Sequence, residues 1–360
     1  MISTDRLLFK KDSPVALRMV EYGTFCDSLA VIVFAKKSDG FSPITLSPRV
    51  SVYPTSSLYK AFYILDAISI GRKVGKEMKP SIVTAQDPFE TGLVGWGVTR
   101  FLKAPLNIQI HTDFLSPYFF KHSLLNSLRL ILSFFLIPQA YSIRVVSERI
   151  KKSIVNHRIL RIHESRISVL PIFVDAERIR TAPVVASLKN KYPRFSRIVL
   201  MASRISKEKN IPLALDAFAE LLKQMPDAGL VIVGSGPQLP YLQKRARDKG
   251  IKNSVVFEPW TDWEILVSFY KTADLFLVTS RYEGYGMALA EAASCRTPII
   301  STDVGIAPEV GAQISPSVST TLSEKILASL RYPTPSRVPD ILSKQNYLRA
   351  YESTLSTISK

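Results

Sequence analysis

Short apolar runs alternate with longer amphipathic stretches along the chain. In the first half, apolar runs that suit buried strands lie at 29–35, 81–86, 106–111 and 142–147. Amphipathic stretches between them, notably LYKAFYILDAISIGRKVGKEM and SLLNSLRLILSFFLI, predict helices. This alternation is typical of a parallel sheet covered by helices on both faces, so we predict an α/β fold.

The same pattern begins again in the second half. RISVLPIFVDAERI (166–179) predicts a last strand and a connection, and new strands are predicted at 197–202, 229–233, 254–257, 274–279 and 298–301. Helical stretches such as NIPLALDAFAELLKQM and PYLQKRARDKG lie between these strands, and the tail QNYLRAYESTLSTISK predicts one more helix. We therefore predict Rossmann-like domains at 1–175 and 176–335, followed by a C-terminal helix within 336–360.

The composition supports two folded domains and narrows the range of partners. With 360 residues, 46% of them hydrophobic and 21% charged, the chain is long and apolar enough for two cores. Its net charge of +17 favours anionic partners such as phosphorylated metabolites, nucleic acid or an acidic membrane surface. The spacing of Cys26 and Cys295 indicates reduced thiols rather than a metal site or a disulfide.

The apolar pattern shows neither a secretion signal nor a membrane span. The opening residues, MISTDRLLFKKDS, lack the apolar core of a signal peptide. No segment reaches the roughly 18 uninterrupted apolar residues of a membrane span. We therefore expect a cytoplasmic protein.

Three segments that follow predicted strands suit a phosphorylated ligand, and MASRISKEKN (201–210) is the first of them. In open parallel sheets, ligands bind outside the carboxyl ends of the strands. Arg204 and Lys209 stand just before a helix here, and two cations with a helix start can hold a diphosphate. Solvated surface cations are the alternative for this segment.

The second segment, VIVGSGP (231–237), places two glycines after another strand. Gly234 and Gly236 let the backbone approach a ligand closely. Leu239 occupies the third glycine position of a dinucleotide fingerprint, so that motif is incomplete. The geometry of a tight turn explains the two glycines equally well.

The third segment, SRYEGYGMALAEAAS (280–294), carries two acids around a glycine-rich turn. Gly284 and Gly286 follow Glu283 and would leave the first amides of the next helix open to a phosphate. Glu291 lies within the small-residue helix, and a helical interval between the acids would span roughly 12 Å. We interpret the acids as hydroxyl-binding groups on either side of a phosphate-binding turn; a helix-capping role is the alternative for Glu283.

Together these segments resemble the E-x7-E signature of retaining GT-B glycosyltransferases, in particular glycosyltransferase family four ("glycosyl transferases group 1"). The similarity includes SRISKEKNIPLALDAF, LVIVGSGP, VVFEPW, ADLFLVTSRYEGYGMALAEAASCRTPIISTDVG and the connector PIFVD. The first half resembles the family in its rhythm, in QIHTD (109–113) and in QDPFETGL (86–93). The resemblance implies two Rossmann-like domains facing across a cleft, the first binding the acceptor and the second the nucleotide sugar, with the C-terminal helix crossing back to the first domain.

The resemblance also implies roles for individual residues. Arg204 and Lys209 would hold the diphosphate of the donor, Glu291 its ribose, and Glu283 the hydroxyls of its sugar. The backbone around the two turns would complete the nucleotide-sugar site, at Gly234, Gly236, Gly284, Gly286 and Met287. His111 would face the donor sugar from the first domain, and we assign catalytic roles to His111 and Glu283. A buried, hydrogen-bonded histidine is the alternative for His111.

The implied reaction transfers a hexose from a UDP or GDP sugar to a hydroxyl of a glycan or lipid, with retained anomeric configuration. Such enzymes need no metal or cofactor because cations and helix dipoles stabilise the leaving diphosphate, and the sequence has no D-x-D motif. No nucleophile is apparent on the far face of the sugar. A route in which the leaving phosphate takes the acceptor's proton is therefore favoured over a covalent intermediate.

Two departures from the family pattern concern recognition. No glycine-rich turn follows the first strand before Gly23, so either the chain begins late relative to the family or acceptor recognition uses another loop. Pro259 in VVFEPW replaces the usual glycine, so we expect recognition of the base near Trp260 to differ.

Other interpretations remain open. SLLNSLRLILSFFLIP (123–138) suits either a buried helix or a patch that docks on an anionic membrane, which would place the protein at the inner face of the cell membrane. RIKKSIVNHRILRIHESR (149–166) suits a solvated basic helix without a nucleic-acid-binding motif, so nucleic acid is not expected as a partner. A sugar-nucleotide epimerase on the same architecture would also use acids and a histidine. It would leave the sugar on the nucleotide, whereas a transferase releases free nucleoside diphosphate.

Overall fold

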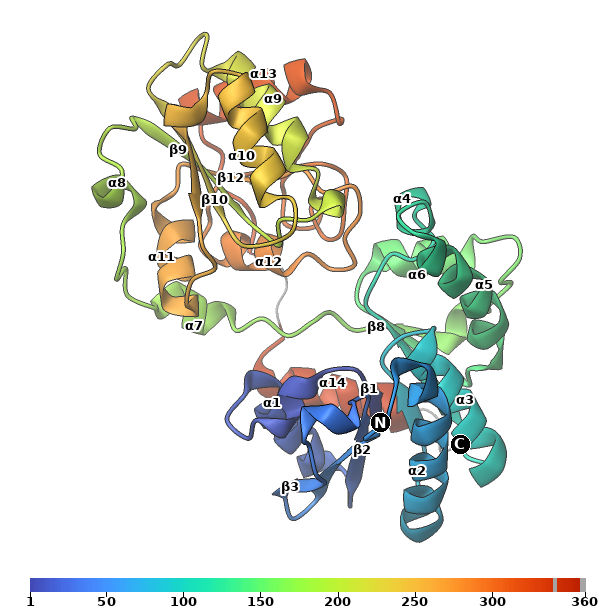
Figure 1. Ribbon diagram of the computed structural model, residues 1–360. Helices are drawn as coiled ribbons and strands as arrows, with labels where there is room; N and C mark the ends of the chain where they lie inside the picture. Colours follow the sequence, from blue (N-terminus) through green and yellow to red (C-terminus); the bar gives the residue numbers. More distant parts are fainter. Residues whose placement is uncertain (339–341, 357–360) are drawn as a thin grey trace. The chain divides into compact units, whose positions relative to one another are not determined.

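The computed structural model describes residues 1–338 and 342–356, which form two compact units (Figure 1). The first unit comprises Met1–Pro171 and the C-terminal segment from Lys344 onward, and the second comprises Ile172–Ser343. The chain therefore changes unit a few residues before the boundary at 175 that the sequence pattern suggested.

The first unit is built on an eight-stranded sheet in the order β3-β4-β2-β1-β5-β6-β7-β8. Neighbouring strands are parallel, except that β3 is antiparallel to β4. The strands are β1 (Ile2–Ser3), β2 (Leu29–Val33), β3 (Ile44–Ser47), β4 (Val50–Pro54), β5 (Val83–Ala85), β6 (Leu106–Ile110), β7 (Ser142–Val145) and β8 (Ile167–Val169). The helices are α1 (Pro14–Tyr22), α2 (Tyr63–Met78), α3 (Glu90–Leu102), α4 (Pro117–Phe120), α5 (Leu124–Gln139), α6 (Glu148–Val155) and α14 (Lys344–Ser356).

Helices α2 and α3 pack together on the sheet of the first unit. Ile32 and Val83 of the strands form one buried cluster with Ala67 of α2 and with Val94 and Val98 of α3. Burying a Val or Ile side chain stabilises the fold by roughly 1.5–3 kcal/mol. The periodic apolar positions of both helices therefore specify which face meets the sheet.

The C-terminal helix α14 belongs to the first unit. The ring of Tyr351 stacks on Tyr22 of α1, with centroids 4.2 Å apart, and Figure 1 shows the red α14 beside the blue α1. The buried Arg144 donates from Nη2 to the hydroxyl of Tyr347 at 3.0 Å, and Gln109 donates from Nε2 to that of Tyr351 at 2.8 Å. Polar side chains of β6 and β7 thus hold the last helix on the sheet.

The second unit contains a six-stranded, wholly parallel sheet in the order β11-β10-β9-β12-β13-β14. The strands are β9 (Arg197–Ala202), β10 (Ala228–Val233), β11 (Val255–Glu258), β12 (Leu275–Val278), β13 (Ile299–Ser301) and β14 (Gln313–Ile314). The helices are α7 (Ala176–Thr181), α8 (Leu188–Lys191), α9 (Ile211–Leu221), α10 (Leu239–Asp248), α11 (Trp263–Thr272), α12 (Met287–Ser294) and α13 (Ser319–Arg331).

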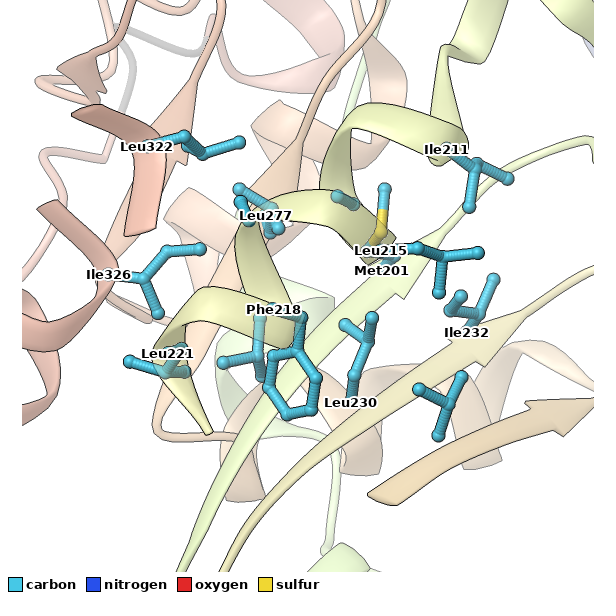
Figure 2. Packing of buried hydrophobic residues seen from close by; sticks show 14 of the residues in the cluster. Met201, Ile211, Leu215, Phe218, Leu221, Leu230, Ile232, Leu277, Leu322 and Ile326 are labelled. Atoms are coloured by element: carbon cyan, nitrogen blue, oxygen red, sulfur yellow. The ribbon is translucent and has the colours of Figure 1, made fainter. Parts of the chain in front are cut away.

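The core of the second unit lies where α9 and α13 meet the sheet. Pro212 occupies the first turn of α9, where a missing amide hydrogen is tolerated. Leu215 and Phe218 of this helix belong to one buried cluster with Leu230 of β10 and Ile326 of α13 (Figure 2). This packing fixes the position of the loop that joins β9 to α9.

The strand order of the second sheet reverses beside β9. β10 and β11 continue to one side of β9, and β12, β13 and β14 continue to the other. Loops that leave the carboxyl ends of β9 and β12 therefore diverge at a topological switch point, where open parallel sheets bind their ligands.

Candidate active site

Loops from three strands of the second unit are bonded to one another at this switch point. The hydroxyl of Thr279, just after β12, donates to the carbonyl of Lys209 at 2.9 Å. The amide of Arg281 donates to the carbonyl of Glu208 at 2.8 Å. Thr302, just after β13, donates from its hydroxyl to the carbonyl of Ser280 at 2.6 Å. The carboxyl edge of the sheet is thus a connected surface.

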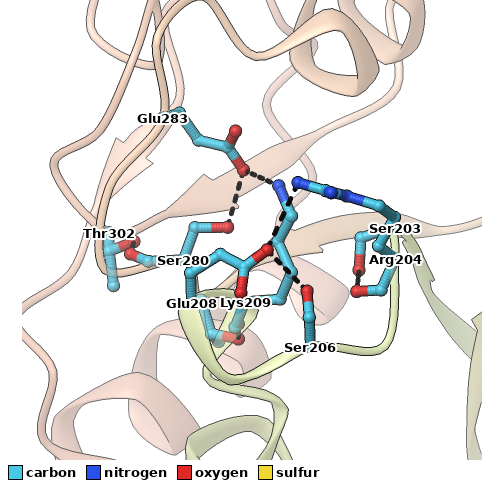
Figure 3. A network of polar contacts seen from close by, with 9 residues as sticks. Ser203, Arg204, Ser206, Glu208, Lys209, Ser280, Glu283 and Thr302 are labelled. Carbon is cyan, nitrogen blue, oxygen red and sulfur yellow. Dashed lines mark hydrogen bonds and ion pairs between the residues drawn. The ribbon is translucent and has the colours of Figure 1, made fainter. Parts of the chain in front are cut away.

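Lys209 and Glu283 form an ion pair across this edge (Figure 3). Lys209 Nζ lies 2.6 Å from Glu283 Oε1, and the hydroxyl of Ser280 donates to the same oxygen at 2.8 Å. Only 14% of the Lys209 side chain and 18% of the Glu283 side chain are exposed. Glu283 is therefore engaged with Lys209, and the described residues show no side chain, Glu283 included, that caps α12.

Arg204 lies beside the pair and is held more loosely. Its Nη2 is 3.3 Å from Glu208 Oε1, which also accepts from the hydroxyl of Ser206 at 2.6 Å. Burial opposes ionisation of Glu208, but the Ser206 hydrogen bond and the charges of Arg204 and Lys209 outweigh it, and the pKa of Glu208 lies below its ordinary value. The Arg204 side chain is 77% exposed, so it can turn towards a bound anion.

Glu291 stands apart from these ions, in a less polar place. Oε2 of this residue accepts a hydrogen bond from the hydroxyl of the buried Tyr270 on α11, at 3.1 Å. Burial raises the pKa of Glu291 above its ordinary value, and the Tyr270 hydrogen bond opposes that rise. The position suits a carboxylate that binds neutral hydroxyl groups rather than cations.

The turn between the acids ends in an uncapped helix start. Gly286 is the N-cap of α12 and has φ 94°, a left-handed conformation that favours glycine. Met287 is the first helical residue, and Gly284 lies within the turn. Because α12 begins only at Met287, half of the interval between Glu283 and Glu291 is a loop, and the spacing of roughly 12 Å expected for a helix does not apply.

Two glycines after β10 let the neighbouring loop pass close to them. A Cβ atom on Gly234 would lie 1.9 Å from the carbonyl oxygen of Ser203, and one on Gly236 would lie 2.3 Å from that of Ile205. The amide of Gly234 already donates to the carbonyl of Glu258 at 3.0 Å. Both glycines therefore have a packing reason that is independent of any ligand.

Replacing Gly236 with alanine is expected to destabilise the protein by about 3 kcal/mol or more, because backbone of the adjoining loop must move. Gly250→Ala is the matched control. Gly250 also has a positive φ, of 70°, but a Cβ there meets no atom within 4 Å, so about 1 kcal/mol is expected. Thermal unfolding of the two variants measures the difference. A Gly236→Ala variant that unfolds like Gly250→Ala but loses nucleotide binding would instead give Gly236 a role in binding.

Sequence reasoning missed two residues of this site. Glu208 was passed over because it sits inside a charged run that resembles a solvated surface. Tyr270 was missed because it lies in an amphipathic helix, 21 residues before Glu291 in the chain. The one available signal for Glu208 was that this acid directly precedes the cation Lys209 in a loop between a strand and a helix.

His111 belongs to the first unit and follows β6. Burial, together with the charges of Arg144 and Arg18, lowers the pKa of His111 to about 3. Its imidazole is therefore neutral near pH 7. Burial raises the pKa of the nearby Asp113, and the charge of Arg149 opposes that rise.

This lowered pKa predicts a loss of stability in acid. Between pH 6.5 and 3 the unfolded chain binds a proton at His111 that the folded chain does not, so stability is expected to fall as the pH falls through this range. The loss is at most about 1.4 kcal/mol per pH unit for one group. Thermal unfolding at pH 7 and pH 4 should show a smaller acid-induced loss in His111→Gln than in wild type. Equal losses would mean that His111 becomes protonated in the folded protein.

The described residues contain neither a group of side chains suited to a metal ion nor a helix suited to spanning a membrane. Within residues 1–338 and 342–356, no three His, Cys, Asp or Glu side chains are grouped in a way that could hold a metal ion. Over the same residues, no helix combines the length and apolar character needed to cross a bilayer.

Solved structures built from two units of this kind define the class of the fold. Sucrose-phosphate synthase from Thermosynechococcus elongatus matches with a TM-score of 0.74 at 16% identity, over 99% of this chain and 94% of that one. The Anabaena protein HepE, solved with UDP-glucose, matches with a TM-score of 0.69 at 18% identity, over 99% and 94%. The fold is GT-B, with two Rossmann-like domains on parallel sheets.

The sequence comparisons then give the family. Residues 188–314 match the family described as "Glycosyl transferases group 1", and residues 28–178 match "Glycosyltransferase Family 4". The chain therefore belongs to the family-four glycosyltransferases of GT-B fold, as its motifs suggested. The relatives below are named as a synthase and a transferase, which does not favour the epimerase alternative.

Two curated relatives illustrate the similarity. The alpha-monoglucosyldiacylglycerol synthase of Streptococcus pneumoniae is 26% identical over 72% of this chain and 58% of that protein. The GDP-mannose-dependent alpha-(1-6)-phosphatidylinositol monomannoside mannosyltransferase of Mycolicibacterium smegmatis is 34% identical over 39% of each. The chain thus spans about three fifths or less of the length of these relatives.

Proposed function

We propose that this protein transfers a hexose from a nucleoside diphosphate sugar to an acceptor hydroxyl, with retention of the anomeric configuration. The observation that carries the proposal is the Lys209–Glu283 pair beside the uncapped start of α12, at the switch point of the second sheet. A cation, an acid and open helix amides together suit a phosphorylated sugar. The named relatives include users of a nucleotide sugar, since one is called GDP-mannose-dependent.

In this proposal each residue of the second unit has one partner on the donor. Arg204 and Lys209 bind the diphosphate, and Glu291 binds the hydroxyls of the ribose. Glu283 binds the hydroxyls of the sugar once the donor has drawn Lys209 towards its phosphates. The backbone completes the site, at Gly234, Gly236, Gly284, Gly286 and Met287.

The proposed chemistry takes place on one face of the sugar. The bond from the anomeric carbon to the phosphate oxygen breaks as the acceptor oxygen bonds to the same face of that carbon. The acceptor proton passes to the leaving phosphate oxygen, and free nucleoside diphosphate departs. Arg204, Lys209 and the α12 amides stabilise its negative charge, so the proposal needs neither a metal nor a cofactor. His111 contacts the donor sugar as a neutral hydrogen-bonding group.

The acceptor and the cellular place belong to the same proposal. The names of the two curated relatives refer to a diacylglycerol and to a phosphatidylinositol, which favours a lipid acceptor over a glycan. Residues 1–171 carry 23 Lys and Arg against 12 Asp and Glu, which favours contact with an anionic membrane. We therefore propose a cytoplasmic enzyme that works at the inner face of the cell membrane.

Calorimetric titration with UDP, GDP and ADP, each with and without magnesium, tests the donor site. We expect one of the three to bind tightly, and equally well in both conditions. Incubation with the matching sugar nucleotide and a lipid acceptor should then release free nucleoside diphosphate. A new sugar that remains on the nucleotide would show an epimerase, and binding of none of the three would refute the donor site.

A further inference from the structure

Helix α5 buries two polar residues together with Leu136 and Ile137, while most of its large apolar side chains on the opposite face are exposed. Five large apolar side chains are exposed along it and are called here the α5 stripe: Leu124 (80%), Leu125 (52%), Leu128 (56%), Ile131 (66%) and Phe135 (47%). Asn126 and Ser133 are buried on its inner side. The interpretation of this segment as a buried helix is therefore wrong for a whole face of α5.

The stripe is continuous rather than a set of scattered positions. At about 100° per residue, four of the five, Leu124, Leu128, Ile131 and Phe135, fall within about 60° of one another, and Leu125 lies about 60° to one side of Leu128. They run along a helix about 24 Å long, and the buried Leu136 lies on a different side. A single apolar ridge of this length needs a partner that is itself apolar and extended.

Bonds on the inner side fix this orientation. Asn126 donates from Nδ2 to the carbonyl of Phe119 at 2.9 Å, and Arg129 Nη2 lies 2.9 Å from Glu90 Oε1 on α3. Turning the apolar face inward would leave the buried Asn126 amide without its partner, which costs about 1–3 kcal/mol. The fold thus holds the stripe outward.

The segment that contains the stripe is rich in cations. Residues 121–166 include nine Lys and Arg but only two Asp and Glu. Lys121 precedes the stripe and is exposed, as are Lys152 and Arg158, and the described residues place no carboxylate in an ion pair with these three. The His157 ring lies 5.1 Å from that of Phe134, so the basic segment that follows α6 runs alongside α5. An apolar ridge edged by cations suits an anionic lipid interface better than a neutral protein surface.

We propose that the α5 stripe inserts into the interface of an anionic membrane while the neighbouring lysines and arginine contact lipid headgroups. This inference rests on the proposed function, because it supplies the surface for the membrane contact proposed there. Its consequence is that a lipid acceptor reaches the first unit from the plane of the membrane.

Sedimentation with lipid vesicles tests the surface without requiring catalysis. Wild type is expected to bind vesicles of phosphatidylcholine with phosphatidylglycerol, and to bind pure phosphatidylcholine more weakly. Leu128→Gln with Ile131→Gln should weaken binding about tenfold or more, since two inserted apolar side chains are lost. Val318→Gln with Tyr332→Gln, a pair with similar exposure in the second unit, should leave binding unchanged. Lys121→Glu with Lys152→Glu should remove the preference for anionic vesicles.

Nucleotide calorimetry on the same variants separates this inference from the proposed function, because none of the changed residues belongs to the donor site. Nucleoside diphosphate binding should be the same in all of them. Absence of wild-type binding to anionic vesicles would overturn the inference, and so would equal binding by the Leu128→Gln and Ile131→Gln variant. A wild-type dimer in sedimentation velocity that this variant abolishes would assign the stripe to a second copy of the chain instead.

Discussion

Changing Glu291 to glutamine is expected to weaken nucleoside diphosphate binding about a hundredfold while the protein stays folded. In the proposed site this carboxylate accepts hydrogen bonds from two ribose hydroxyls. Hydrogen bonds to a charged group contribute about 1.5 kcal/mol or more each, and the loss of two corresponds to about two orders of magnitude in affinity. Glutamine keeps an oxygen for the Tyr270 hydroxyl, so the buried tyrosine is not left without a partner.

Tyr270→Phe is the matched control for this prediction. It removes the hydrogen bond to Glu291 but keeps the carboxylate, so we expect a loss of affinity below tenfold and a loss of about 1 kcal/mol in stability. Calorimetry with the preferred nucleotide and thermal unfolding of both variants provide the readout. Wild-type affinity in Glu291→Gln would assign Glu291 only the structural task of receiving the Tyr270 hydroxyl.

The raised pKa of Glu291 adds a pH dependence to the same binding step. Only the carboxylate form accepts both hydrogen bonds, so nucleotide affinity is expected to fall as the pH drops through the raised pKa. The fall should begin at a higher pH than an exposed glutamate would give. Tyr270→Phe should move it higher still, because the hydrogen bond that lowers this pKa is gone.

The sequence was most informative at the ends of predicted strands, where charged residues recur. Arg204 and Lys209 follow β9 and Glu283 follows β12, and the parallel arrangement brings those strand ends to one edge of the sheet, whereas Glu291 lies within α12. The sequence could not show that Glu283 pairs with Lys209, which stands 74 residues away in the chain. Such a pairing depends on strand order, and the apolar pattern does not encode the order of strands in a sheet.

The first unit shows a second limit of prediction from the apolar pattern. The apolar pattern predicted a helix over α5, but not that Asn126 and Ser133 would face inward. Ser133 bonds within α5, to the carbonyl of Leu130, whereas Asn126 bonds to the carbonyl of Phe119 on α4, whose position beside α5 the apolar pattern does not give. The hairpin of β3 and β4 was missed for a related reason, because β3 is a partly exposed edge strand whose run is too polar to stand out.

The loop after β1 is held in place by one of its own side chains. It lacks a glycine-rich turn, and Arg6 ties it to two other segments instead. The Arg6 guanidinium donates from Nε to the carbonyl of Phe34 at 3.2 Å and from Nη2 to the hydroxyl of Tyr63 at 2.9 Å, and it pairs with Asp39 at 3.1 Å. This loop is therefore ordered by side-chain bonds, which a search for glycines does not detect.

Changing Lys209 to methionine is expected to have the largest effect of all, lowering both nucleoside diphosphate affinity and transfer rate about a thousandfold. The variant lacks a cation for the diphosphate and also leaves Glu283, a mostly buried carboxylate, facing the phosphates without its partner. The lost attraction of Lys209 and the unbalanced repulsion by Glu283 both weaken binding of the diphosphate. Calorimetry and release of nucleoside diphosphate from the donor measure the two losses separately.

Glu283→Gln should affect the transfer rate and the nucleoside diphosphate affinity differently. Transfer is expected to fall about a hundredfold, because the carboxylate no longer orients the sugar hydroxyls. Affinity for the free nucleoside diphosphate should stay within a few-fold or rise, because Lys209 is released from its ion pair. Ser280→Ala, which removes only the second hydrogen bond to Glu283, should change transfer less than tenfold.

The double variant Lys209→Met with Glu283→Gln decides whether the ion pair itself matters. If the acid repels the phosphates once Lys209 is gone, adding Glu283→Gln should recover part of the affinity that Lys209→Met alone loses, so the two effects will not add. Simple additivity would mean that the two side chains act on the donor independently and that their contact at 2.6 Å has no part in binding. Recovery of affinity without recovery of transfer would mean that Lys209 binds the phosphates and Glu283 binds the sugar.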